Sequence, residues 1–170
     1  LICRTCNNLS DATEKALKDI GGAEAERAAS EYVRISEIPF DSVRTCMSVM
    51  VKNKRGEYFP MSKGGADVML GKASHYIENG RVKRMDKAAL DRFRAQNDAL
   101  ASRALRVLAA AYKTLLPSDA EQYKKSADRN KNARLESGLI FAGFIGLMDR
   151  PREEVPAAVQ LCADAGIRTI

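Results

Sequence analysis

The alternation of apolar and polar residues predicts an α+β fold. In residues 45–53, Met47, Val49 and Val51 fall on one face of a predicted strand, as expected for a half-buried strand. Residues 138–149 are apolar on both faces, which is typical of a strand buried on both sides. Because strands cluster in the middle of the chain, with helices before, between and after them, a layered α+β architecture is favoured.

The same pattern predicts where the individual elements lie. Strands are expected at residues 33–40, 45–53, 58–63, 103–113 and 138–149, with a hairpin at 75–85. Helices are expected at residues 10–22, 23–32, 64–73, 86–101 and 151–166, and residues 1–8 resemble the end of a helix. The alanines of 103–113 would also suit a helix. Residues 117–134 are polar and poorly patterned, so we expect a loop with one helical turn, and residues 167–170 are expected to open a strand.

Local signals support several of these boundaries. Asp11 is a natural N-cap with Glu14 three residues later, a capping-box pattern, and Gly21-Gly22 would end that helix. The Asn79-Gly80 pair between strand-like flanks is a strong hairpin signal. Helix 86–101 is amphipathic, and its apolar stripe consists of Ala89, Leu90, Phe93 and Leu100.

Positive charge is concentrated in one part of the chain. The 170 residues carry a net charge of +6, and residues 81–134 hold fourteen Lys or Arg against six Asp or Glu. Such a region attracts polyanions, including nucleic acid and nucleotide phosphates. Residues 81–97 mix both signs at helical spacing, and we interpret most of these charges as a solvated helix face. A basic nucleic-acid-binding module is the alternative function, with only Phe93, Tyr112 and Tyr123 available there for base stacking.

Metal, redox and membrane signals are weak. Cys3 and Cys6 form a C-x-x-C pair, but no second pair follows at zinc spacing and the single histidine, His75, is distant in sequence. We therefore expect no metal site and reduced thiols. The longest uncharged apolar run, residues 138–148, is far shorter than the roughly 20 residues of a membrane-spanning helix. Because the sequence begins with Leu1 and not with methionine, we interpret it as a piece of a longer chain.

Six motifs occur in a characteristic order. They are DATEKAL at 11–17, PFDSVRTCMSVMV at 39–51, SKGGAD at 62–67, ALRVLAAAY at 104–112, GFIGLMDRPREEV at 143–155 and QLCADAGIRTI at 160–170. Neither a Walker-type phosphate loop nor a strand-linked G-x-G-x-x-G is present. In their order and spacing the six motifs resemble the nucleotide-binding (N) domain of P-type cation-transporting ATPases, in particular the calcium-pump-like branch. The resemblance covers nearly the whole chain and implies an ATP-binding domain of the α+β class, with a central antiparallel sheet flanked by helices.

The resemblance assigns nucleotide-binding roles to residues in four of these motifs. Phe40 would stack on the adenine ring, and Met47 belongs to the same motif; base–aromatic stacking is worth roughly 1–3 kcal/mol. From the residues alone, Phe40 could equally pack into the sheet edge as part of the core. Lys63 would lie deep in the adenosine pocket on its phosphate side, and Gly64 would leave room for a ligand beside the backbone.

The remaining assigned residues are acidic, basic and apolar. Glu14 would reach the adenine amino group, a role compatible with helix capping. Arg106 would meet the ribose and phosphates, since a guanidinium can bind phosphate oxygens bidentately, with Leu108 flanking the base. Arg44 would also contribute to phosphate binding. Ser42 and Thr45 stand where many relatives carry basic residues, so the resemblance implies weak nucleotide binding with a modest preference for ATP over ADP or AMP.

The resemblance also implies how the chain is organised and what it works with. Residues 1–148 would form the nucleotide-binding domain, and residues 149–170 a hinge, with Asp149 and Arg152, leading back into a phosphorylation domain. The sequence has no D-K-T-G-T, T-G-D or G-D-G-x-N-D motif, so it supplies no catalytic residue and should hold ATP without hydrolysing it. ATP would bind as Mg-ATP, with Mg²⁺ held mainly by the phosphorylation domain.

The full-length protein would be an ATP-driven cation translocase, and this chain a cytoplasmic domain of that integral membrane protein. Its partners would be ATP and the phosphorylation and actuator domains of the same chain; neither nucleic acid nor insertion into the membrane is expected. Calcium is the first candidate for the transported ion, ahead of magnesium or a monovalent cation. A structural interaction domain with a degenerate pocket is a further alternative.

Overall fold

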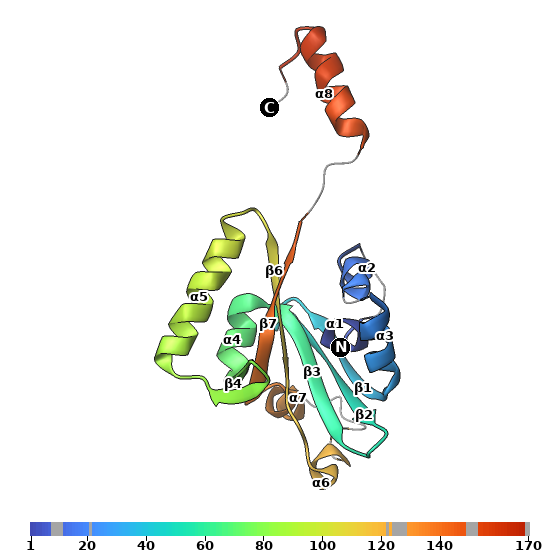
Figure 1. The fold of residues 1–170 in the computed structure, drawn as a ribbon, viewed down its shortest axis with the longest axis vertical. Helices are drawn as coiled ribbons and strands as arrows, with labels where there is room; N and C mark the ends of the chain where they lie inside the picture. The colour runs from blue at the N-terminus through green and yellow to red at the C-terminus, as the bar shows by residue number, and fades with distance from the viewer. Residues whose placement is uncertain (8–11, 21, 122, 124–128, 149–152, 169–170) are drawn as a thin grey trace.

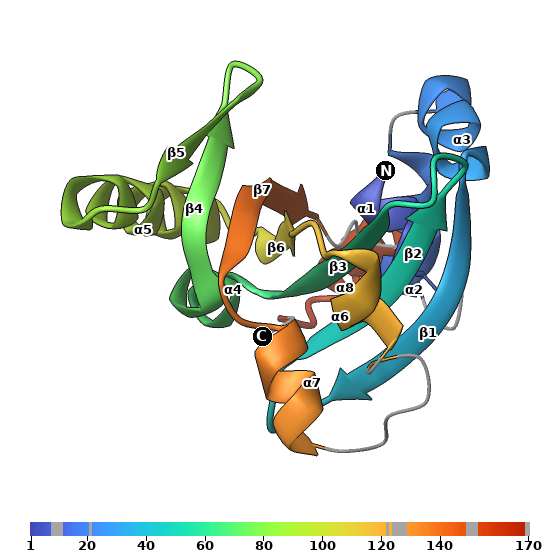
Figure 2. The same cartoon turned by 90° about the horizontal axis from the view of Figure 1, so that it is seen from below.

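A seven-stranded sheet forms the centre of the molecule, with strand order β1-β2-β3-β6-β7-β4-β5 (Figures 1 and 2). The computed structural model describes residues 1–7, 12–20, 22–121, 123, 129–148 and 153–168. The strands are β1 (Tyr32–Asp41), β2 (Cys46–Asn53), β3 (Tyr58–Gly65), β4 (Ala73–Glu78), β5 (Arg81–Arg84), β6 (Arg106–Tyr112) and β7 (Leu139–Leu147). Neighbouring strands run antiparallel except β4 and β7, which are parallel. The predicted α+β class with a flanked antiparallel sheet is confirmed.

Helices cover the sheet on both faces (Figure 1). They are α1 (Ile2–Thr5), α2 (Ala12–Asp19), α3 (Gly22–Ser30), α4 (Ala66–Lys72), α5 (Lys87–Ala101), α6 (Pro117–Glu121), α7 (Arg129–Leu135) and α8 (Glu154–Asp164). The N-terminal helices and the α4–α5 pair lie on opposite sides of the sheet, whereas α8 stands apart from it. No described helix is both long and apolar enough to cross a membrane.

The alternation of β2 supplies apolar side chains to both faces. Met47, Val49 and Val51 form one buried cluster with Cys6, which follows α1. This confirms the face predicted from the sequence. On the opposite face Met50 packs against Tyr58 of β3. The sheet is therefore buried on both sides at β2. This burial fixes the register of β2 against its neighbours.

A second core lies between the sheet and helices α4 and α5. Phe93 of α5 is the centre of an aromatic cluster, with its ring 5.2 Å from that of Tyr76, 4.8 Å from Phe141 and 6.4 Å from Phe144, measured between ring centroids. Such edge-on and tilted arrangements are favoured between aromatic rings. Ala89 is also buried in this core, as its place in the predicted stripe requires.

Two local predictions are confirmed in detail. Asn79 and Gly80 adopt positive φ angles of 52° and 74°, the conformation that a two-residue type I′ hairpin requires, and they join β4 to β5. Asp86 caps α5 by accepting a hydrogen bond of 2.8 Å from the backbone N–H of Ala89. With Asp86 as its N-cap, α5 begins at Lys87, one residue after the predicted start of helix 86–101.

Two predictions are wrong, one is confirmed against its alternative, and several lie outside the described residues. Residues 117–134 hold two helices, α6 and α7, and not one turn, because Ala120 of α6 is buried against Met50 and Tyr58. The alanine-rich segment 103–113 is a strand, since β6 is paired on both sides, with β3 and β7. Ile167 and Arg168 are not in a strand. The predicted cap Asp11, the Gly21 of the predicted helix stop, the hinge residues Asp149 and Arg152, and residues 169–170 lie outside the described residues.

Candidate functional site

A cavity of about 490 Å³ opens where the ends of β1 and β3 meet the beginnings of β2 and β6, beside α2. This volume falls within the range typical of small-molecule sites. Its lining comprises Thr13, Glu14, Phe40, Thr45, Met47, Lys63, Gly64, Gly65, Arg106, Val107 and Leu108. The fold thus gathers seven of the eight predicted binding residues, which are spread over almost one hundred positions of sequence, around one space. Arg44 does not line it.

Phe40 stands at the mouth of this cavity with an open ring. Its side chain is 63% exposed, near the C-terminal end of β1. The alternative that Phe40 fills the core is therefore wrong. Exposing the apolar surface of an aromatic ring to water is unfavourable. Beside a cavity, however, the exposed ring offers a flat face on which a planar ligand can stack. Behind it, Met47 lines the same cavity and is 2% exposed.

A buried ion pair lies in the wall of the cavity. Nζ of Lys63 is 3.0 Å from Oε1 of Glu14, and the two side chains are 8% and 10% exposed. The pair joins α2 to β3, and no local sequence pattern predicts that these two residues contact each other. Because a buried charge is costly without a partner, each side chain offsets the cost of burying the other. The cavity therefore contains a fixed cation and a fixed anion side by side.

Arg106 and Leu108 enter the cavity from β6. Two residues apart on one strand, they share a face, as the sequence predicts. Arg106 is exposed, and its Nη1 donates a hydrogen bond of 3.3 Å to Oγ1 of Thr13 on α2. This places an exposed guanidinium among the lining residues of the cavity.

Gly64 is required by the neighbouring strand. A Cβ built on Gly64 would lie 2.5 Å from the carbonyl oxygen of Thr45 and 2.6 Å from Cβ of Cys46. Both distances are far below van der Waals contact. The packing of β2 against β3 therefore explains the glycine, and room for a ligand is not needed to account for it.

We predict that Gly64→Ala lowers the free energy of unfolding by about 1–3 kcal/mol, because the added methyl overpacks a backbone contact that cannot relax. Gly65→Ala is the matched control, since its nearest atom would be Thr45 Oγ1 at 3.8 Å. Urea unfolding of both variants measures the difference. Equal stability of the two variants would contradict the packing explanation.

Arg44 lies outside the cavity and is engaged elsewhere. Its Nη1 forms an ion pair with Oε1 of Glu136, and its Nη2 donates a hydrogen bond to the carbonyl oxygen of Pro39. The guanidinium is thus tied to a carboxylate, and this arrangement does not favour the predicted phosphate contact.

Glu136 is a buried charged residue that the sequence analysis missed. It follows α7 and is 1% exposed, and it accepts hydrogen bonds from Ser48 Oγ at 2.7 Å and Lys72 Nζ at 3.1 Å. Burial raises the pKa of its carboxyl, but the hydrogen bonds from Ser48, Arg44 and Lys72 outweigh burial and leave the pKa below its usual value. Its partners are 64 to 92 residues away in sequence, so no local pattern could have identified it.

The lowered pKa of Glu136 makes a prediction about acid stability. The carboxyl of a glutamate in an unfolded chain has a pKa of about 4.3. A carboxyl with a lower pKa in the folded state stabilises the fold above the unfolded pKa, and this stabilisation is lost as the pH falls through the folded pKa. We expect the difference in free energy of unfolding between the wild type and Glu136→Gln to shrink as the pH drops through about 4. Urea titrations at several pH values measure it. A difference that does not change with pH would contradict the ionised carboxylate.

The thiols and acidic residues do not form a metal site among the residues that the structure describes, where no group of three His, Cys, Asp or Glu is close enough to hold an ion. Cys6 is buried and its Sγ donates to the carbonyl oxygen of Met61 at 3.0 Å. Burial raises its pKa to about 12, so the thiol stays protonated.

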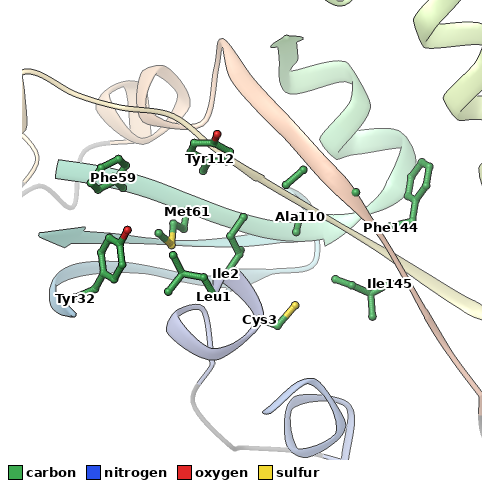
Figure 3. A pocket seen from close by; sticks show the side chains of 12 residues that line it. Leu1, Ile2, Cys3, Tyr32, Phe59, Met61, Ala110, Tyr112, Phe144 and Ile145 are labelled. Atoms are coloured by element: carbon green, nitrogen blue, oxygen red, sulfur yellow. The ribbon is translucent and has the colours of Figure 1, made fainter. Parts of the chain in front are cut away.

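A second cavity, of about 480 Å³, differs in chemistry (Figure 3). It lies between α1 and strands β1, β3, β6 and β7, and its lining comprises Leu1, Ile2, Cys3, Tyr32, Phe59, Met61, Ala110, Tyr112, Ala142, Gly143, Phe144 and Ile145. None of these side chains carries a charge at neutral pH. A phosphate-bearing ligand is therefore much better matched to the cavity at Phe40.

The aromatic residues of the basic region are buried or partly buried. Phe93 is 9% exposed and packed in the core, and Tyr112 and Tyr123 are partly buried. The guanidinium of Arg92 lies 4.8 Å from the Phe93 ring centroid and pairs with Glu78. The Phe93 ring and the Arg92 guanidinium are thus engaged within the protein, whereas a nucleic-acid-binding surface would need exposed rings and cations.

Comparison with known families decides what kind of domain carries this cavity. The family model described as P-type ATPase, cytoplasmic domain N, matches residues 4–154. The chain belongs to this family. The resemblance stated from the six motifs is thereby confirmed, and the chain is a calcium-pump-like N domain of a P-type ATPase.

Relatives of the N domain are calcium-transporting ATPases. Calcium-transporting ATPase 1 of Bacillus cereus is 35% identical over 164 residues, which cover 94% of this chain and 17% of the relative. The calcium-transporting ATPase of Bacillus subtilis is 32% identical, with the same two shares. Calcium-transporting ATPase 2, endoplasmic reticulum-type, of Arabidopsis thaliana is 32% identical over 81% of this chain and 14% of the relative. The chain thus spans less than a fifth of the length of these relatives.

Proposed function

We propose that this N domain binds ATP in the cavity at Phe40 and presents its γ-phosphate to an aspartate in a neighbouring phosphorylation domain. The observation that carries the proposal is the convergence of an exposed aromatic ring, a deep Lys63–Glu14 pair and a rim guanidinium on one cavity of suitable size. In such a transfer the work of this domain is positioning, because bringing reactants into line removes much of the entropic barrier.

Each side chain has a role that suits its chemistry. The Phe40 ring would stack on adenine, whose amino group is a hydrogen-bond donor that the Glu14 carboxylate can accept. Lys63 supplies positive charge in the depth of the cavity, and Arg106 can bind phosphate oxygens at the rim. Leu108 would flank the base.

Mg²⁺ would come with the nucleotide and be held mainly by the phosphorylation domain. Among the described lining residues Glu14 is the only carboxylate, and it is ion-paired with Lys63. These residues therefore fit the nucleotide and not the metal. When bound, Mg²⁺ would shield the charge of the phosphates.

The names of the relatives support a proposal for the full-length protein. We propose an ATP-driven cation translocase in which residues 1–148 form the nucleotide-binding unit and residues 149–170 lead back into the phosphorylation domain. Calcium is the proposed ion, because the relatives are named calcium-transporting ATPases. The domain would lie on the cytoplasmic side and meet the phosphorylation and actuator domains of its own chain.

Calorimetric titration of the 170-residue chain with Mg-ATP, ADP and AMP tests the proposal. We expect weak binding of all three, with ATP preferred by less than about tenfold, a difference of about 1.4 kcal/mol, and no steady-state ATP hydrolysis. Absence of binding at millimolar ATP would contradict the nucleotide site. Hydrolysis that is lost on mutating Glu14 or Lys63 would contradict the division of labour between domains.

A further inference from the structure

Glu136 and Arg44 connect α7 to the turn that carries the exposed ring. Glu136, the residue after α7, lies beside the beginning of β2, where it contacts Arg44 and Ser48. The carboxylate is almost completely buried and pairs with Arg44, whose second terminal nitrogen donates to the carbonyl oxygen of Pro39. Pro39 directly precedes Phe40. The guanidinium therefore joins both ends of the turn and is itself held by Glu136.

The turn formed by residues 39–45 is closed from within as well. Oδ1 of Asp41 accepts hydrogen bonds from the backbone N–H groups of Val43 at 2.8 Å and Arg44 at 3.0 Å. The N–H of Thr45 donates to the carbonyl oxygen of Asp41 at 2.7 Å. These bonds shape the turn, but they do not attach it to the rest of the molecule.

Thr45 is the strained position of the turn, and its carbonyl oxygen accepts a hydrogen bond of 3.0 Å from the N–H of Gly65 on β3. Its φ angle is 48°, an unfavourable left-handed conformation for a β-branched residue. Its Oγ1 is buried without a hydrogen-bond partner among the described residues. Strained backbone of this kind persists only where surrounding contacts determine it, and such positions cluster at functional sites.

We propose that Glu136 is a positioning residue for the nucleotide site, holding the 39–45 turn through Arg44 so that the Phe40 ring stands over the cavity. The contacts of Glu136 with Ser48 of β2 and Lys72 of α4 anchor the carboxylate to two further elements. Glu136 thus links the sheet, α4 and the turn without touching the ligand. The consequence for ligand binding rests on the proposed function, whereas the restraint on the turn does not.

Hydrogen exchange of the free protein tests the restraint directly. In Glu136→Gln we expect the amides of Arg44 and Thr45 to exchange at least about tenfold faster relative to the amides of β3, because local opening of the turn becomes easier. Lys72→Gln is the matched control: it removes another partner of Glu136 but does not touch the turn, and the ratio should stay at its wild-type value. If Glu136→Gln does not fold, Glu136→Asp, whose carboxylate is one methylene too short to reach Arg44, takes its place. A ratio that is unchanged, or that rises equally in Lys72→Gln, would overturn the proposal.

Ligand binding separates positioning from general stability. Glu136→Gln should weaken ATP binding by about tenfold through loss of base stacking and change the affinity for inorganic tripolyphosphate by less than about twofold. Arg44→Gln should behave alike, and the double variant should be no weaker than either single variant. Equal losses for ATP and tripolyphosphate would overturn the proposal. If the wild type binds no ATP, the proposed function fails, and the exchange ratio still decides whether Glu136 holds the turn.

Discussion

Replacing Phe40 with alanine should weaken ATP binding by roughly five- to 150-fold, which corresponds to the 1–3 kcal/mol that base–aromatic stacking contributes. The ring is 63% exposed, so its removal should change the free energy of unfolding by less than about 0.5 kcal/mol. Calorimetric titration with ATP and urea unfolding of the same variant measure both quantities. A large loss of affinity with almost no loss of stability identifies a side chain whose role is ligand binding.

Val43→Ala is the matched control for Phe40→Ala. Val43 lies in the same turn, is apolar, and is 93% exposed, but it does not line the cavity. Its substitution should leave both affinity and stability near the wild-type values. A near-wild-type affinity in both variants would show that the ring does not contact the nucleotide, and an equally large loss in both would indicate a disturbed turn.

Lys63→Met should have the largest effect on stability, lowering the free energy of unfolding by about 3 kcal/mol, the lower end of what breaking a buried ion pair costs. The substitution keeps the length and the apolar stem of the side chain but leaves the carboxylate of Glu14 without the cation 3.0 Å away. ATP binding should also weaken, because the cavity loses its deep positive charge. Urea unfolding and titration measure the two effects.

Two further variants show whether the effects of Lys63→Met come from breaking a buried ion pair. The double variant Lys63→Met/Glu14→Gln removes both charges, so it should recover most of the stability but not the affinity for ATP. Lys54→Met breaks the exposed Lys54–Glu31 pair, whose side chains are 70% and 54% exposed, and should cost no more than about 1 kcal/mol. If Lys63→Met and Lys54→Met were equally stable, the Lys63–Glu14 pair would not behave as a buried one.

Local patterns predicted most elements of the fold because these depend on neighbours in sequence. The alternation of Met47, Val49 and Val51 located β2 and its buried face, and Asn79-Gly80 located the hairpin. The helices at 117–134 were missed, since their sequence is polar and their order depends on tertiary contacts such as that of Ala120 with Met50. Apolar periodicity carries no information when a short helix is held by one or two buried residues.

The candidate site could be predicted as a set of residues but not as a set of contacts. The motifs named seven residues that the fold brings around one cavity. The Lys63–Glu14 pair, 49 residues apart, and the Arg44–Glu136 pair, 92 residues apart, depend on how distant elements meet. The positive charge of Arg44 suggests a phosphate contact. In the structure Arg44 forms an ion pair with the buried carboxylate of Glu136 instead.

Chemical-shift mapping by NMR during titration with Mg-ATP tests the nucleotide site most directly. If the cavity at Phe40 holds the nucleotide, the resonances that move will belong to Thr13, Phe40, Lys63 and Arg106, and the Phe40 ring will show ring-current effects on the adenine protons. Residues of the apolar cavity near Tyr112 should stay unchanged. Shifts centred on that apolar cavity, or none at millimolar ATP, would contradict the proposed site.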